Sequence, residues 1–512
     1  MTNYTTKICL AVILLLAAIF RFWQIGSLPA GLFPDEAANG LDVNSILSDD
    51  AQPFYERGNG REALFFYFLA ASISAFGRSP AAHHAVSAAF GFLAVGAAYF
   101  LTKRLFDARV ALLASFFMAV SSYAVLITRT AFRATMVPLL SSLTLLFLVI
   151  AIQAKSKRTR LWSAAGAGLS FAGGFYTYTS FRMMLPLLAL MLSVLLFGER
   201  KKIAKIYQTY RVPAVVFCAA FAAGISWLAF YFFKHPASIV GRAGQVSIFS
   251  PDLNGGDVFG TFLAVLKATL LSFFTNGDLN WRHNVSGYSF LDPAVSVFFA
   301  AGLIIFTFAI FKKRYEMTLV AAWFWLMLVP EATTAEGIPH GLRLIGVMPA
   351  IFIMAAWPAA WLWGKFKDME WMYNFKYVLA IFFIAGIFFY NFALYFGVAS
   401  ASPDYHYAFR SDLTTVSAYL NERNSASATY LSLDKFSVQT VEYLTTQTGN
   451  PYILVDPAHT FELKLKPGDQ VVFTQSTLYD RLKFIKSHSR AELVRTEKNK
   501  FGEIIMLVYQ QP

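Results

Sequence analysis

Long apolar runs separated by short polar segments dominate the first four fifths of the chain. The first run extends from Ile8 to about Ile25, and runs of roughly 17 to 23 residues recur up to Gly397. About 20 apolar residues are enough for a helix to cross a bilayer core. The pattern predicts an α-helical polytopic membrane protein with about eleven spans, near residues 8–26, 82–101, 110–127, 134–154, 161–176, 183–197, 212–232, 293–311, 317–330, 342–363 and 377–397.

Two further apolar segments are too short to span. They are Ala63–Phe76, of about 14 residues, and Val258–Phe274. Counting the first as a span would move every later loop to the opposite side of the membrane. We therefore expect both segments to lie along the membrane surface or to re-enter it.

The composition agrees with this membrane assignment. Of 512 residues, 57% are hydrophobic and only 14% are charged, which excludes an ordinary soluble fold. The first run lacks a small-residue cleavage site and carries Arg21 and Trp23 at its end, so we expect an uncleaved anchor and a mature chain that begins at Met1. Cys9 and Cys218 lie in separate apolar runs, which argues against a disulfide framework or a cysteine metal site.

The net charge of +13 is distributed unevenly between the two sets of loops, and this sets orientation rather than indicating a nucleic-acid partner. The lysine-rich set, including Lys155–Arg160, is expected in the cytoplasm. The other set, with the loop from Leu28, the loop Phe233–Asp292 and everything after Gly397, is expected outside. An arginine bias on this face suits binding of phosphate or carboxylate; its basic residues before the tail are Arg21, Arg57, Arg61, Arg78, Arg129, Arg133, Arg182, Arg242, Arg282 and Arg343, against Lys234 and Lys267.

After the last apolar run the pattern changes to short, alternating segments. This predicts a small extracytoplasmic α/β domain at residues 399–512, after a transmembrane domain at 1–398. We expect helices near 402–424, 438–445 and 478–488, and strands near 429–433, 452–455, 470–473 and 504–508. The tail carries no nucleotide-binding glycine loop, so we assign it a positioning or substrate-recognition role.

The first polar segment, Leu28–Gly40, contains the adjacent carboxylates Asp35 and Glu36. Carboxylates beside a membrane span are costly unless they are solvated, paired or coordinating a ligand. Pro34 favours an extended residue before it, and the acidic pair then suits the first turn of a helix, where carboxylates face the positive end of the helix dipole. Two interpretations stand: a helix start, and the centre of an active site.

Several motifs on the outer loops together resemble a known family. They are the acidic pair with Asp35 after the first span, Asn59-Gly-Arg-Glu62 later in the same loop, Arg133, and His340-Gly-Leu-Arg343. With these motifs the chain resembles bacterial membrane glycosyltransferases of the GT-C class, and more narrowly the protein O-mannosyltransferase and aminoarabinose transferase group, glycosyltransferase family 39. The likeness covers roughly residues 8–363, and the tail is similar to the soluble domain of many members. Two departures are Ala63, where relatives usually have proline, and His84, where they have arginine and where one phosphate contact is therefore in doubt.

The resemblance implies an inverting hexosyl or pentosyl transferase in the bacterial plasma membrane. Such an enzyme takes a sugar from a polyprenyl-phosphate donor and passes it to a lipid, glycan or protein acceptor on the extracytoplasmic face. Cationic side chains would stabilise the departing phosphate, and a carboxylate would take the proton of the acceptor hydroxyl. Direct displacement inverts the anomeric centre without a covalent enzyme intermediate.

The resemblance also suggests residue roles. Asp35 is the expected general base, Glu36 orients it or helps to bind the acceptor, and Glu62 is a second acid or a metal ligand. If a divalent metal ion is present, Asp35 and Glu62 are its expected ligands. The expected donor-phosphate contacts are Arg133, Arg182, His340 and Arg343.

Other interpretations of these residues remain open. Arginines at helix ends often only reach the interface, although His340 and Arg343, three apart after a proline, share a helix face. Tyr176 and Tyr178 fit interfacial belt aromatics better than sugar platforms. His83 and His84 are adjacent and therefore point in different directions on a helix, which argues against a shared metal.

Two other classes of function compete with a transferase. A transporter or flippase for lipid-linked sugars would place polar residues at mid-membrane on broken helices. Here the spans are nearly devoid of ionisable groups and charge concentrates at the outer face, which favours chemistry at the interface. A non-catalytic scaffold would not need the Asp35–Glu36 pair.

Overall fold

The computed structural model describes residues 2–239, 246–312, 314–367, 375–423, 427–449 and 451–512. Arg242 lies outside these ranges. The chain divides into two compact units. The first unit contains Met1–Trp23, Gln52–Phe68 and Ala85–Ala399; the second contains Gln24–Ala51, Leu69–His84 and Ser400–Pro512.

Helices occupy every position at which a span was predicted. In the described part of the chain, eight helices are long and apolar enough to cross a membrane, or nine if a bent pair counts as one span. Helices α8 and α14, of 19 and 18 residues, occupy the two remaining positions. The bounds are α1 Asn3–Phe22, α4 Pro80–Leu105, α5 Ala108–Val120, α6 Ser122–Arg129, α7 Val137–Gln153, α8 Lys157–Phe175, α9 Met184–Gly198, α10 Ile203–Lys234, α13 Pro293–Ala309, α14 Tyr315–Ala332, α15 Met348–Lys367 and α16 Phe375–Phe392.

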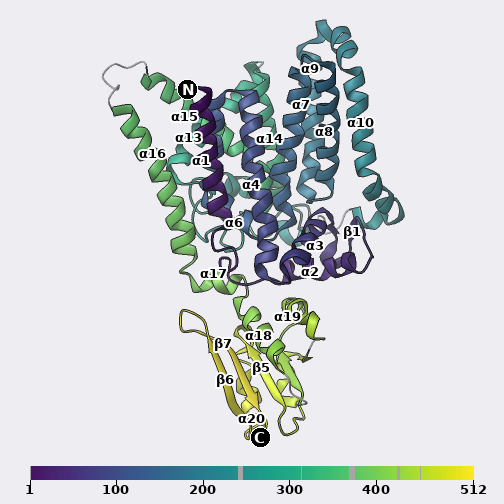
Figure 1. Cartoon of the computed structure of the whole chain (residues 1–512), viewed down its shortest axis with the longest axis vertical. Coiled ribbons are helices and arrows are strands. Elements are labelled where there is room, and N and C mark those ends of the chain that lie inside the picture. Colours follow the sequence, from purple (N-terminus) through teal and green to yellow (C-terminus); the bar gives the residue numbers. More distant parts are fainter. Residues whose placement is uncertain (1, 240–245, 313, 368–374, 424–426, 450) are drawn as a thin grey trace. The chain divides into compact units, whose positions relative to one another are not determined.

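Most of these helices form a bundle in the first unit, in which α8 packs against both α7 and α10 (Figure 1). The multi-pass helical membrane architecture is therefore confirmed. The short apolar helices α3 (Leu64–Phe76) and α12 (Val258–Leu271) fall below the length of a span, as the sequence predicted.

The bent pair α5 and α6 is held in the first unit by buried arginines. The two helices meet at an angle of 58°. The guanidinium of Arg21 donates hydrogen bonds to the carbonyls of Met118 (3.1 Å) and Ala119 (2.9 Å), at the end of α5. Arg129, at the end of α6, in turn donates to Phe20 O (2.8 Å) at the end of α1. Both arginines satisfy carbonyls that lack helical partners, which a low-dielectric environment requires.

Short 3₁₀ turns lead into three of the spanning helices. Turn η2 (Arg133–Met136) precedes α7, η3 (Thr179–Met183) precedes α9, and η8 (Arg343–Val347) precedes α15. Each turn carries one of the predicted phosphate arginines. The loop after α1 contains α2 (Pro34–Leu47) in the second unit and the two-stranded pair β1 (Phe54–Tyr55) and β2 (Arg61–Glu62) in the first.

The second unit contains the small C-terminal sheet domain that was predicted (Figure 1). Its five strands have the order β4-β3-β5-β7-β6, with β3 parallel to β4 and β5, and β7 antiparallel to β5 and β6. The strand β6 was not predicted, because its charged residues are exposed on both faces and show no alternation. The bounds are α17 Pro403–Ala408, α18 Ser411–Glu422, β3 Thr429–Ser432, α19 Val438–Thr445, β4 Ile453–Val455, β5 Gln470–Thr474, α20 Arg481–Ser487, β6 Glu492–Lys498 and β7 Ile504–Gln510.

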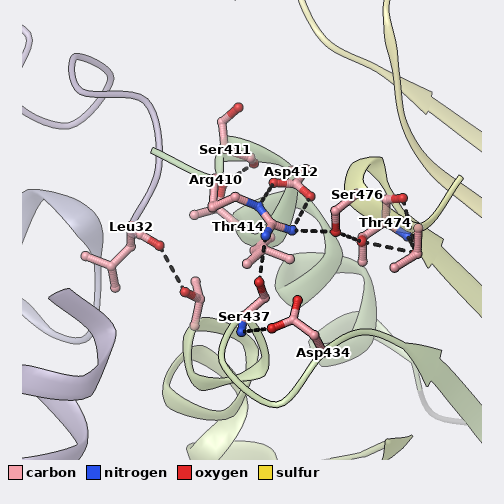
Figure 2. Close-up of polar contacts among 12 residues, drawn as sticks. Leu32, Arg410, Ser411, Asp412, Thr414, Asp434, Ser437, Thr474 and Ser476 are labelled. Carbon is pink, nitrogen blue, oxygen red and sulfur yellow. Dashed lines mark hydrogen bonds and ion pairs between the residues drawn. The ribbon is translucent and has the colours of Figure 1, made fainter. Parts of the chain in front are cut away.

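A buried polar cluster ties the helices of this domain to its sheet (Figure 2). The guanidinium of Arg410 binds both carboxylate oxygens of Asp412, each at 3.0 Å, just before and within α18. It also donates to Ser437 Oγ (2.7 Å) before α19 and to Ser476 Oγ (3.1 Å) after β5. A buried ion pair needs such additional partners to offset its desolvation, so we interpret the cluster as structural.

Candidate functional site

The two adjacent carboxylates at the start of α2 have different environments. Glu36 is fully buried, and its Oε2 accepts the backbone N–H of Phe33 at 2.9 Å. Its Oε1 lies 3.2 Å from Nε2 of the buried His84. Asp35 is exposed. The helix-start interpretation therefore fits Glu36, whose carboxylate stabilises the first turn, while Asp35 is presented to the surroundings from that turn.

His83 and His84 point in different directions, as their adjacency predicted. Nδ1 of His83 lies 3.1 Å from Ser79 O, and its ring packs edge-on against Tyr443, 5.0 Å between centroids. His84 faces Glu36. At position 84 this chain thus has an imidazole that contacts the helix-start glutamate.

Helix α19 of the sheet domain packs against α2 inside the second unit. A methyl group on Gly40 would lie only 2.5 Å from the ring of Tyr443, so α2 and α19 approach closely because position 40 has no side chain. The guanidinium of Arg78 lies over the same ring, 5.3 Å from its centroid. Thr440 Oγ1 donates to Leu32 O at 3.0 Å, just before α2 (Figure 2). The sheet domain therefore supports the helix that carries Asp35.

The substitution Gly40→Ala is expected to destabilise the protein, because the added methyl group overlaps the Tyr443 ring. Overpacking of this kind costs about 1–3 kcal/mol, more than the roughly 1 kcal/mol that alanine gains over glycine in a helix. The double variant Gly40→Ala/Tyr443→Leu should recover most of the loss. Thermal unfolding in detergent measures both effects.

The matched control for this prediction is Gly386→Ala in α16, where an added methyl group meets no atom within 4 Å. It should melt at or above the temperature of the parent. Equal melting temperatures for Gly40→Ala and Gly386→Ala would show that the α2–α19 contact is not tight.

In the first unit, the predicted site residues Arg133 and Arg182 come together around a third, Glu62. This carboxylate is 2% exposed, at the end of β2. Its Oε2 lies 3.5 Å from Nη1 of Arg133, and its Oε1 lies 3.6 Å from Nη2 of Arg182. Arg133 also donates to Gly60 O at 3.3 Å, and its guanidinium lies 5.7 Å from the centroid of the Tyr178 ring. A buried carboxylate is thus balanced by two guanidinium groups from two separate helix-leading turns.

Arg343 forms a second centre with two glutamates. Its Nη1 lies 3.7 Å from Oε2 of Glu331 and its Nη2 lies 3.6 Å from Oε2 of Glu336. Glu331 is fully buried at the end of α14, and its Oε1 accepts the backbone N–H of His340 at 2.8 Å. Glu331 was missed in the sequence, although a carboxylate that ends an apolar run after a proline is itself a signal of a polar site.

The hydroxyl group of Tyr178 is affected by the charges of both arginine centres. Burial raises the pKa of this phenol, while the positive charges of Arg133 and Arg343 act in the opposite direction. Both guanidinium groups therefore lie within electrostatic range of one tyrosine. The side chain that we interpreted as an interfacial aromatic contacts Arg133, one of the proposed phosphate residues.

Among the described residues, one group of three or more histidine, cysteine or acidic side chains could hold a metal ion: Asp278, His283 and His340. One ligand atom of each lies within 4.8 Å of the others. Asp35 and Glu62, the ligands expected from the sequence, are not members of this group.

Comparisons with known proteins agree with this architecture. Residues 63–227 match the family model described as dolichyl-phosphate-mannose-protein mannosyltransferase. No curated protein sequence matches the chain.

Solved structures that are similar over essentially the whole chain include the following two. ArnT from Cupriavidus metallidurans, bound to undecaprenyl phosphate, is similar with a TM-score of 0.59 and 12% identity, over 99% of this chain and 98% of that one. The oligosaccharyltransferase AglB from Archaeoglobus fulgidus, in complex with an inhibitory peptide and a dolichol-phosphate, gives 0.56 and 14%, over 100% of this chain and 74% of that one. The chain therefore has the GT-C glycosyltransferase fold, and the predicted resemblance to this class is confirmed.

Proposed function

We propose that the protein transfers a sugar from a polyprenyl-phosphate donor to a lipid, glycan or protein acceptor on the extracytoplasmic face of a bacterial plasma membrane. The observation that carries this proposal is the convergence of Arg133 and Arg182 on Glu62, with Arg343 near the same tyrosine. The polyprenyl phosphates bound by ArnT and AglB, which share the fold, support a lipid-phosphate ligand here.

The arginine centres suit a phosphate that leaves during the reaction. Guanidinium groups bind phosphate through paired, charge-assisted hydrogen bonds. When the bond to the sugar breaks, negative charge grows on the phosphate, and preorganised cations stabilise that charge without having to rearrange. Glu62 and Glu331 balance the same cations, which keeps the buried carboxylates paired with partly buried guanidinium groups.

Asp35 is the proposed general base. Asp35 is exposed on the first turn of α2. Glu36 stabilises this turn because its carboxylate accepts the N–H of Phe33. The acceptor hydroxyl must lose its proton as it attacks, and a positioned carboxylate can take that proton. Attack opposite the leaving phosphate inverts the anomeric centre. Glu36 thus acts as a positioning residue in this proposal.

The proposal divides the chain into a transmembrane domain at residues 1–398 and a soluble domain at 399–512, with the soluble domain and the Asp35 loop outside the cell. Reporter fusions after Ser48, Ser156 and Gln511 test this arrangement. We expect extracytoplasmic signals from Ser48 and Gln511 and a cytoplasmic signal from Ser156, because lysine-rich loops remain inside. Eleven spans place the two ends of the chain on opposite sides of the membrane. A cytoplasmic signal at Gln511 would therefore contradict the eleven-span arrangement.

The cellular test of the function is mass spectrometry of lipids and surface glycans from cells with and without this protein. A transferase predicts one sugar-modified product that disappears on deletion and returns with the wild-type chain but not with an Asp35→Asn chain. Identical profiles in all three strains would oppose the proposal.

A further inference from the structure

Two loops of the first unit bring together three side chains of the types that bind metal ions in proteins. Asp278 and His283 lie between α12 and α13, and His340 lies between α14 and η8. One potential ligand atom of each is within 4.8 Å of the other two. Asp278 and His283 are 5% and 4% exposed, and the two imidazole rings lie 4.3 Å apart between centroids. The group thus gathers nitrogen and oxygen ligands in a place largely shielded from solvent.

Backbone contacts hold these side chains in place. Asp278 Oδ2 accepts the N–H of Gly341 at 2.8 Å and lies 2.9 Å from Nδ1 of His283. Asp278 Oδ1 accepts the N–H of Asn280 at 2.7 Å. A methyl group on Gly341 would lie 2.9 Å from His283 O, so the two loops meet closely at a glycine. Such supporting contacts fix ligand orientation before an ion binds.

The simpler interpretation is an Asp278–His283 hydrogen bond that closes a loop, with His340 stacked on it. It accounts for Asp278 and for one nitrogen of His283. It leaves Nδ1 of His340 buried without a hydrogen-bond partner. A buried polar atom of this kind calls for a ligand, because leaving it unsatisfied costs about 1–3 kcal/mol in general.

We propose that Asp278, His283 and His340 bind a divalent transition-metal ion, with zinc the best match. Two imidazoles and one carboxylate favour Zn²⁺ over Mg²⁺ or Ca²⁺, which prefer oxygen ligands. Three protein ligands leave a further coordination position. The ion joins the loop of Asp278 to the loop of His340, and so fixes the turn that carries Arg343. The zinc measurements do not depend on sugar transfer, so the assignment can fail while the proposed transferase activity stands.

Metal content of the purified full chain tests the assignment. The protein is treated with chelator, exposed to ZnCl₂, desalted and measured by mass spectrometry for metals. We expect about one zinc per chain for the parent and a loss of at least roughly fivefold for Asp278→Asn and His340→Gln. The control is His459→Gln, an exposed histidine 3.9 Å from Asp456, which should keep the parental zinc content.

Cobalt substitution of the parent gives a second readout that does not depend on the folding of any variant. Co²⁺ added to the stripped parent should produce visible absorption bands of a nitrogen- and oxygen-ligated site, and equimolar Zn²⁺ should remove them. Zinc should also raise the melting temperature of the parent, because the folded state binds it. The assignment would be overturned if no cobalt bands appeared and if the parent and His340→Gln contained the same amount of zinc. The three side chains would then form only a hydrogen-bonded cluster.

Discussion

The substitution Asp35→Asn is expected to lower the rate of sugar transfer by a factor of about 10² to 10⁴, the range usually lost with a general base. Asparagine keeps the shape of aspartate, and in the first turn of α2 it loses only a favourable interaction with the helix dipole of about 0.3–1 kcal/mol, so α2 should still form. Glu36 keeps its contact with the Phe33 N–H in this variant, and the guanidinium groups on the helix-leading turns are unchanged. Donor binding should therefore survive while turnover is lost.

The control for this experiment is Asp49→Asn, another exposed carboxylate in the segment after α2. Asp49 has a φ of +63°, a left-handed conformation that asparagine also adopts readily. It should transfer sugar at the parental rate. If Asp35→Asn stays within about threefold of Asp49→Asn, Asp35 is not the base, and Glu62 becomes the next candidate.

Replacing Arg343 by glutamine is expected to weaken donor binding by about 10- to 150-fold, which corresponds to about 1.5–3 kcal/mol for a charge-assisted contact to phosphate. The variant also removes a positive charge beside the fully buried Glu331. Some loss of thermal stability should therefore accompany the loss of binding.

A second substitution separates these two effects. In Arg343→Gln/Glu331→Gln the buried carboxylate is neutralised as well, and glutamine can still accept the N–H of His340. We expect this double variant to regain stability without regaining donor affinity. Arg490→Met, which removes an exposed arginine of the sheet domain, serves as the charge-matched control. Donor affinity restored by the double variant would place the phosphate site elsewhere.

The helical part of the fold could be read from the sequence because a membrane span has a simple signal. Apolar length alone located the helices, and the shortness of α3 and α12 excluded them as spans. The start of α2 was predicted from Pro34 and the acidic pair, since local sequence determines a helix start. The strand β6 gave no such signal, because an edge strand with charged residues on both faces lacks a period of two.

Only part of the candidate site could be predicted from the sequence. Motifs identified Glu62, Arg133 and Arg182, but not that both guanidinium groups would converge on one carboxylate. Glu331 looked like the last residue of a span, and Asp278 and His283 lay in a long loop without a spacing motif. Their partner His340 follows more than 50 residues later, so only folding brings them together. Arg21 and Arg129 were counted among the basic residues of the outer face, and nothing in the sequence indicated that their guanidinium groups would bind main-chain carbonyls inside the first unit.

The most direct test of the central proposal is release of polyprenyl phosphate by the purified protein. A polyprenyl-phosphate sugar is mixed with the protein in detergent and an acceptor extract, and the liberated lipid phosphate is quantified over time. A transferase predicts release that depends on acceptor, equals the sugar gained by product and falls at least about 100-fold in Asp35→Asn. The contradicting result would come from the protein in liposomes. If the donor moved between leaflets with its sugar still attached, and no lipid phosphate were released, the protein would be a transporter.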